Sequence, residues 1–149
     1  MRPQHSDSPE ESARRFDVAL FIVHPTVDPA EITAGLGLEP IVTHPVGERR
    51  RTPKGDLLPG QYRDTRWRHR VRYEVKHQYF ADAITALVDR LEPYKAFLSK
   101  LRSTGGEASI IIQFLGDGYF GDKIAKETLS KLAELDLDFA IECFSVPQR

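Results

Sequence analysis

Residues 66–76 read RWRHRVRYEVK and alternate strictly between two kinds of side chain. One set is mainly apolar or aromatic: Trp67, His69, Val71, Tyr73 and Val75. The other set is charged: Arg66, Arg68, Arg70, Arg72, Glu74 and Lys76. Because successive side chains of a β-strand point to opposite faces, this pattern predicts a strand with one face on a core and one face in solvent. We therefore expect the arginine heads to be exposed, and Trp67, Val71 and Tyr73 to be buried.

Three other segments have strand character. Residues 16–24 are rich in β-branched and aromatic side chains and are apolar on both alternating sets through their middle, as expected of a strand covered on two faces. Residues 108–115 and 136–144 also read as strands. The segment between the first strand and the arginine strand, residues 38–65, contains repeated prolines and glycines, and we expect a long irregular connection there.

Helix signals separate these strands. Asp28 can cap a helix that has Pro29 at its first position, and Gly35 or Gly37 can end it. Residues 79–101 carry apolar residues at helical spacing. Pro93 interrupts that pattern and predicts two helices or one sharp kink.

A last amphipathic helix is expected at residues 122–134, with Asp122 as its cap. The order β-α-β-α-β-α-β then predicts an α/β (α+β) fold, in which a single mixed sheet of four to five strands packs against helices. We interpret residues 1–15 as a disordered tail and residues 16–149 as one globular domain, a usual size for a single core.

The composition indicates a cytoplasmic protein that does not enter a membrane. Hydrophobic residues make up 40% of the chain and charged residues 29%, as in globular proteins. The longest apolar run, residues 18–23, is far too short to span a bilayer, and residues 1–15 lack the apolar stretch of a secretory signal. A single cysteine, Cys143, suits a reducing compartment. It shares one alternating set with Leu137, Phe139 and Ile141, so we expect it to be buried.

Charge is distributed unevenly along the chain. Residues 44–76 hold ten Lys or Arg against four Asp or Glu, whereas the whole chain has a net charge of −1. Arginines at every second strand position would stand about 7 Å apart, near the spacing of phosphates along a nucleic-acid strand. The candidate binding residues for an anionic partner are Arg49, Arg50, Arg51, Lys54, Arg66, Arg68, Arg70 and Arg72. The alternative interpretation is a solvated face that pairs with acidic residues of the same chain.

Other motifs carry less weight. Residues 116–121 match G-x-G-x-x-G, but Asp117 would put a negative charge where a pyrophosphate must approach, so we expect no cofactor. None of the five histidines has a partner at a diagnostic metal-ligand spacing, and we expect no metal site. Of these, His24 ends a strand, where chemistry often takes place, and His69 reads as a partly buried structural residue. No catalytic residues can be assigned.

Short motifs give the chain a family resemblance. Residues 28–32 (DPAEI) and 36–40 (LGLEP), Gly47 with the later Trp67, and residues 91–93 (LEP) resemble the bacterial family catalogued as domain of unknown function 4279. The resemblance covers roughly residues 16–145. It implies the fold given above and no activity, because the family has no assigned catalytic residues.

Two classes of function follow. The first is a non-enzymatic interaction protein that recognises an unidentified protein partner. The alternative is a nucleic-acid or other polyanion-binding module that uses the basic segment 44–76. If helices cover only one face of the sheet, a second apolar set would face water, and we then expect a homodimer whose interface includes Phe21, Ile111 or Phe144.

Overall fold

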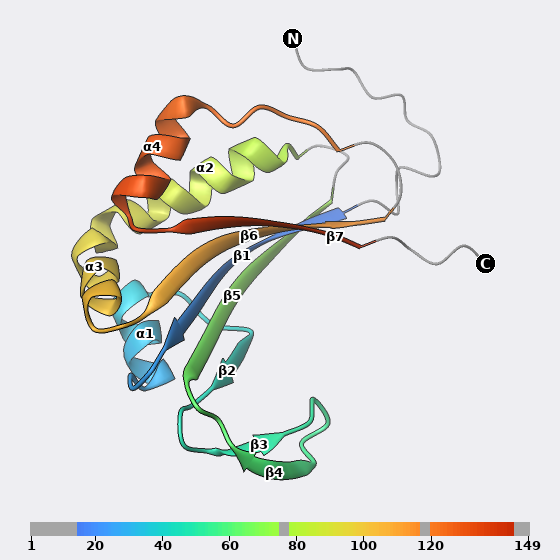
Figure 1. The fold of residues 1–149 in the computed structure, drawn as a ribbon. Coiled ribbons are helices and arrows are strands. Elements are labelled where there is room, and N and C mark those ends of the chain that lie inside the picture. Colours follow the sequence, from blue (N-terminus) through green and yellow to red (C-terminus); the bar gives the residue numbers. More distant parts are fainter. Residues whose placement is uncertain (1–14, 75–77, 117–119, 145–149) are drawn as a thin grey trace.

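A computed structural model describes residues 15–74, 78–116 and 120–144. Within these residues, five strands form one mixed sheet in the order β2-β5-β1-β6-β7 (Figure 1). The strands are β1 (Arg15–His24), β2 (Val42–His44), β5 (Thr65–Glu74), β6 (Glu107–Leu115) and β7 (Asp138–Phe144). Neighbours pair antiparallel, except that β6 and β7 are parallel. The predicted fold class and the approximate order of elements are confirmed.

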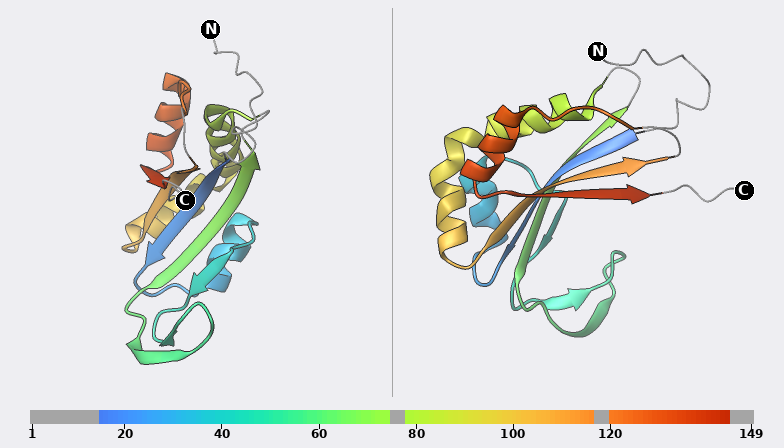
Figure 2. Two further views of the ribbon diagram at one scale, coloured as in Figure 1. Left: turned by 90° about the vertical axis from the view of Figure 1, so that its right-hand side faces the viewer. Right: turned by 45° about the horizontal axis from the view of Figure 1, so that its top comes forward.

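In the described parts of the chain, four α-helices lie on one side of the sheet and none lies on the other (Figures 1 and 2). They are α1 (Pro29–Leu36), α2 (Phe80–Leu91), α3 (Lys95–Ser103) and α4 (Lys126–Glu134). Asp28 caps α1 by accepting a hydrogen bond from Ala30 N–H at 2.8 Å, as predicted. Pro93 lies in a short 3-10 helix between α2 and α3, so the predicted break is confirmed. In the described part of the chain, no helix is long and apolar enough to cross a membrane.

The core lies between β1 and these helices. Phe16, Val18, Leu20 and Ile22 alternate along β1 and are at most 1% exposed. Trp67 of β5 is paired in register with Ile22 and is fully buried, as predicted. The later β5 residues on this side are less covered: His69 and Tyr73 are half-buried, and Val71 is 38% exposed. The expected burial of Val71 is therefore wrong, because the helices cover this face of β5 mainly near its start.

Helix α4 and strand β7 begin later than the sequence predicted. Asp122 does not cap α4, whose N-cap is Ala125 without a side-chain hydrogen bond; Asp122 instead accepts a hydrogen bond from Lys123 N–H. Asp136 has a positive φ of 55° and belongs to the turn before β7. The C-terminal part of β7 extends beyond α4 (Figure 1), and Cys143 there is exposed. The predicted burial of Cys143 is wrong for this reason.

The expected irregular connection at residues 38–65 is partly regular. It contains β2, which pairs with β5, and a separate hairpin of β3 (Arg49–Arg51) and β4 (Leu57–Gln61). The hairpin projects from the end of the sheet where β5 begins, away from the helices (Figure 1). Residues 45–64, which include this hairpin, are called the arm below.

The helix-free side of the sheet is called the open face below. Its apolar residues are covered to different degrees. Ala19 is fully buried and Ile111 is 5% exposed, so neighbouring side chains within the chain already cover them. Phe21 is half-buried and Phe144, at the end of β7, is 49% exposed. The apolar surface left for a second subunit is therefore smaller than the sequence suggested. The predicted tail, residues 1–15, is one residue too long, because Arg15 is the first residue of β1. For residues 1–14 the disordered tail stays a prediction, since they lie outside the described residues.

Candidate functional site

The arm is anchored to the body of the protein at Thr65, the first residue of β5. Its hydroxyl donates a hydrogen bond to the carbonyl of Val27 at 2.6 Å and accepts one from Val46 N–H at 3.1 Å. Thr65 is fully buried, so these bonds are shielded from water. The buried Thr65 side chain thus connects the loop after β1 to the start of the arm, and it fixes where the arm leaves the sheet.

Backbone hydrogen bonds close the arm into a hairpin. Gly47 N–H donates to the carbonyl of Tyr62, and Tyr62 N–H donates to the carbonyl of Glu48, each at 2.9 Å. At the tip, Thr52 N–H donates to the carbonyl of Asp56, and the Thr52 hydroxyl accepts from Asp56 N–H at 3.0 Å. Gly55 supplies the positive φ of 93° that the turn requires. The arm is therefore held at its base and at its tip by the main chain.

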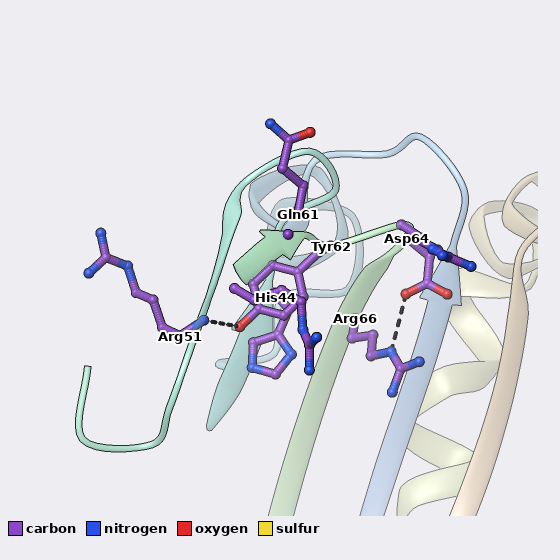
Figure 3. Close-up of a pocket in the computed structure, with 9 residues that line it drawn as sticks. His44, Arg51, Gln61, Tyr62, Asp64 and Arg66 are labelled. Atoms are coloured by element: carbon purple, nitrogen blue, oxygen red, sulfur yellow. Dashed lines mark hydrogen bonds and ion pairs between the residues drawn. The ribbon is translucent and has the colours of Figure 1, made fainter. Parts of the chain in front are cut away.

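A pocket of about 680 Å³ lies between the arm and the first residues of β5 (Figure 3). The lining residues are His44, Arg50, Arg51, Gly60, Gln61, Tyr62, Arg63, Asp64 and Arg66. Four of them are arginines and one is a carboxylate. The carboxylate of Asp64 accepts a hydrogen bond from Arg66 Nε at 3.1 Å. Three guanidinium groups then remain in excess, and the pocket has the electrostatic character of an anion site.

Two aromatic rings form one wall of this pocket. His44, from β2, and Tyr62, from the arm, stack with ring centroids 4.5 Å apart and planes 5° from parallel. The Tyr62 hydroxyl accepts a hydrogen bond from the backbone N–H of Arg51 at 3.2 Å, as Figure 3 shows. The Tyr62 ring is thereby held against both the hairpin and the edge of the sheet.

A second, smaller pocket of about 240 Å³ adjoins the first on the open face. Its lining comprises Phe21, Val42, His44, Arg66, Trp67 and Arg68. It shares His44 and Arg66 with the larger pocket. The guanidinium carbon of Arg68 lies 5.1 Å from the centroid of the Phe21 ring, which is within the range of a cation–π contact. This pocket is mainly apolar and is bordered by cations.

The other end of the arginine row has a partner within the chain. Asp17 of β1 is 1% exposed, and its carboxylate accepts hydrogen bonds from Arg72 Nε at 2.8 Å and Arg72 Nη2 at 3.0 Å. Arg70 Nη1 lies 3.7 Å from the same carboxylate. The hydrogen bond and charge of Asp17 raise the pKa of Arg72. Two of the predicted binding arginines are therefore engaged by a buried carboxylate.

The eight predicted site residues consequently form three groups: residues that line a pocket, residues on the arm outside both pockets, and the two arginines beside Asp17. Arg50, Arg51 and Arg66 line the larger pocket, and Arg68 lines the smaller one. The side chain of Arg51 is at the pocket rim, where its Nη1 donates to the carbonyl of Gly55 at 3.2 Å. Arg49 and Lys54 lie on the arm outside both linings, and Arg49 Nε donates to the carbonyl of Leu58 at 3.3 Å. Sequence reasoning did not select His44, Tyr62 and Arg63 as binding residues. The basic composition of residues 44–76 includes them, but no local pattern indicates that they meet.

His24 is a structural residue at the opposite end of β1 from Asp17. Its Nδ1 accepts hydrogen bonds from Thr26 N–H at 3.1 Å and Val27 N–H at 3.0 Å, so the ring proton is on Nε2, which lies 2.7 Å from the Thr104 hydroxyl. Burial lowers the pKa of the imidazole, against a smaller opposing effect of Glu31. These contacts use both ring nitrogens, so His24 has no nitrogen left for a ligand.

The remaining sequence candidates do not form a site in the described residues. No group of three or more His, Cys, Asp or Glu residues there could hold a metal ion. His69 is half-buried, as predicted. Its Nδ1 donates to the carbonyl of Glu39 at 2.7 Å, while its buried Nε2 has no hydrogen-bond partner. Residues 117–119 of the glycine motif lie outside the described part of the chain.

One comparison with known proteins identifies a relationship. A family model described as "Domain of unknown function (DUF4279)" matches residues 14–143. Neither the curated proteins nor the solved structures contain a match to this chain.

Proposed function

We propose that this chain, which belongs to the DUF4279 family, is a non-enzymatic binding protein that holds an anionic ligand between its arm and the start of β5. The observation that carries the proposal is the excess of guanidinium groups around the larger pocket: Arg50, Arg51 and Arg63 have no carboxylate on the pocket wall other than Asp64, which is bonded to Arg66. Guanidinium groups bind phosphates and carboxylates by paired, charge-assisted hydrogen bonds.

Geometry favours the arm over the arginine strand as the main anion site. The Asp17 carboxylate already neutralises Arg72 and lies near Arg70, so a polyanion would have to compete with a buried partner there. The arm presents five Lys or Arg residues against three Asp or Glu between residues 45 and 64. The described salt bridges include none between these arm cations and the acidic residues of the helices.

Salt-dependent binding tests this proposal. A fluorescently labelled polyanion is titrated with the full chain at several salt concentrations between 50 and 300 mM, and anisotropy gives the Kd. We expect the logarithm of affinity to fall linearly with the logarithm of salt concentration. Replacing Arg50 and Arg51 by Gln should weaken binding at least tenfold, whereas Arg102→Gln on α3 should leave it unchanged. Equal loss in both variants, or no binding at low salt, would contradict the proposal.

A protein partner is the second candidate, and the free edge of β7 favours it. Among the strands of the described residues, β7 is the last in the sheet, and Ile141 and Phe144 on it are 62% and 49% exposed. Edge strands with unpaired backbone groups and apolar side chains pair readily with another chain. Two β7 strands related by a two-fold axis would pair antiparallel and join two sheets, so the partner we propose is a second copy of this chain.

Light scattering at about 10 μM tests the homodimer. We expect a dimer for the natural chain and a monomer for Ile141→Lys, because a lysine on an edge strand opposes pairing. Leu129→Lys is the matched control, since Leu129 is 48% exposed but lies on α4. A monomeric natural chain would exclude self-association through β7.

We place both functions in the cytoplasm. Cys143 is exposed, and an exposed thiol persists most readily in a reducing compartment. Fractionation of cells that produce the tagged chain should recover it with cytoplasmic markers.

A further inference from the structure

The two pockets at the base of the arm differ in chemistry and share a wall. The larger one is lined by four arginines, and the apolar side chains of the smaller one on the open face are Phe21 and Val42. His44 and Arg66 belong to both linings. A ligand that filled both would carry negative charge on one side and a flat or apolar group on the other.

From this juxtaposition we infer that the ligand is a nucleotide unit, a planar base joined to phosphate, with the phosphate at the arginines of the arm and the base over Phe21 and Val42. This inference rests on the proposed anion site and names its ligand class. The base could belong to a free nucleotide or to one residue of a single-stranded nucleic acid, since both present the same chemistry.

Features of the smaller pocket suit a base. Val42 is 44% exposed and Phe21 is half-buried, so an incoming ring can reach apolar surface there. Arg68 already lies over the Phe21 ring, and a guanidinium in that position can also stack on a base. Arg66 lies next to this surface and reaches the arm pocket, so one side chain can contact base and phosphate together.

The larger pocket suits phosphate more than other charged ligands. Its single carboxylate, Asp64, and its cationic surroundings oppose a divalent metal ion. At about 680 Å³ it lies within the usual size range of small-molecule sites. Arginine forks from β3 (Arg50 and Arg51) and from the segment after β4 (Arg63) can approach a phosphate from different sides.

Isothermal titration calorimetry measures the affinity of each ligand without a label. The full chain is titrated with pyrophosphate, adenosine 5′-monophosphate, a ten-residue single-stranded oligonucleotide and a tetraglutamate peptide. We expect the mononucleotide and the oligonucleotide to bind about tenfold more tightly than pyrophosphate or tetraglutamate, because base stacking adds to phosphate binding.

Two variants separate this inference from the anion site on which it rests. Phe21→Leu keeps an apolar side chain but removes the ring, and it should lower the preference for nucleotide over pyrophosphate about tenfold. Arg51→Gln should weaken the binding of every anionic ligand. Circular dichroism checks that each variant is folded, and Arg102→Gln is again the control.

Each outcome decides between the two claims. If pyrophosphate binds, but the nucleotides bind no more tightly and Phe21→Leu changes nothing, the anion site stands and the nucleotide inference is overturned. If no ligand binds at low salt, both fail. If tetraglutamate matches the nucleotides, an acidic peptide is the better ligand class and the inference is overturned. Tighter binding of the oligonucleotide supports the inference and identifies a single-stranded nucleic acid as the source of the base. Equally tight binding of the mononucleotide supports it and identifies a free nucleotide as the source.

Discussion

The two ends of β5 carry the same alternating arginines and use them differently. At the far end, Arg72 is bonded to Asp17, a buried carboxylate on the neighbouring strand. At the end next to the arm, the β1 neighbours of Arg66 and Arg68 are Val23 and Phe21, which offer no charge, and the carboxylate bonded to Arg66 is that of Asp64, at the surface. The alternation decides which face an arginine occupies, whereas the strand beside it decides whether the charge remains available to a ligand.

On the opposite, helix-covered face of β5, the two ends differ in how well their side chains are packed. Trp67, near the arm, is fully buried, while Val71, further along, is 38% exposed. The end of β5 that offers its arginines to a ligand is therefore also the end that is most firmly packed on the helices. A binding site next to a well-packed core is held in position by it.

The largest effect should follow from removing the packed side chain. Trp67→Ala should lower the free energy of unfolding by about 3–5 kcal/mol, because a large buried ring leaves a cavity. Val71→Ala, on the same face, should cost less than about 1 kcal/mol, because the residue is partly in water already. Urea unfolding followed by circular dichroism measures both, and similar losses would show that the two ends are equally packed.

Neutralising the internal carboxylate should have the next largest effect. Asp17→Asn should lower the free energy of unfolding by about 2 kcal/mol, since it weakens charge-assisted hydrogen bonds to a buried group. It should also free Arg70 and Arg72, and so strengthen polyanion binding at low salt. Asp64→Asn, whose pair with Arg66 is exposed, should change stability by less than about 1 kcal/mol.

Stability should depend on pH through His24, which is paired in register with Thr65 at the arm end of β5. Because burial lowers its pKa in the folded chain, the unfolded chain takes up the proton first as pH falls below 6.5, and the folded chain loses stability. The contribution is fully present above pH 6.5 and decreases at up to about 1.4 kcal/mol per pH unit below it. Urea titrations between pH 7.5 and 5 measure the slope, which should be smaller in His24→Gln.

The smallest effect on stability is expected in the arm. Arg51→Gln should change the free energy of unfolding by less than about 0.5 kcal/mol, because its side chain is exposed. The same variant should reduce the slope of log affinity against log salt by about 0.7 for a single strand, as expected for one lost phosphate contact. Destabilisation as large as that of Asp17→Asn would mean that the arm supports the fold.

Local signals predicted the parts of the fold that local chemistry determines. The Asp28 cap, the break at Pro93 and the alternation around Trp67 each depend on neighbouring residues, and each was readable from the chain. The short strands β2, β3 and β4 were missed, because three to five residues become a strand only through backbone pairing with a distant partner.

The candidate site was predicted only in part, because it too depends on contacts between residues that are distant in the chain. Its charge was evident from composition, but the selection among the arginines depends on Asp17, which lies about 55 residues earlier beside an apolar run. The stacking of His44 on Tyr62 requires β2 and the arm to come together, which no local pattern indicates. Cys143 looked buried, because its alternating set is apolar and the limited reach of α4 along β7 cannot be read from the chain.

The position of β1 in the middle of the sheet has a consequence for synthesis on the ribosome. Its two neighbours are β5 and β6, and β6 is completed only at Leu115, about 90 residues after β1 ends at His24. At translation rates of about 5–20 residues per second, the apolar stretch of β1 waits several seconds for its second neighbour. Until β6 is complete, the nascent chain presents a hydrophobic strand with at least one unpaired edge, which is the kind of segment that chaperones bind.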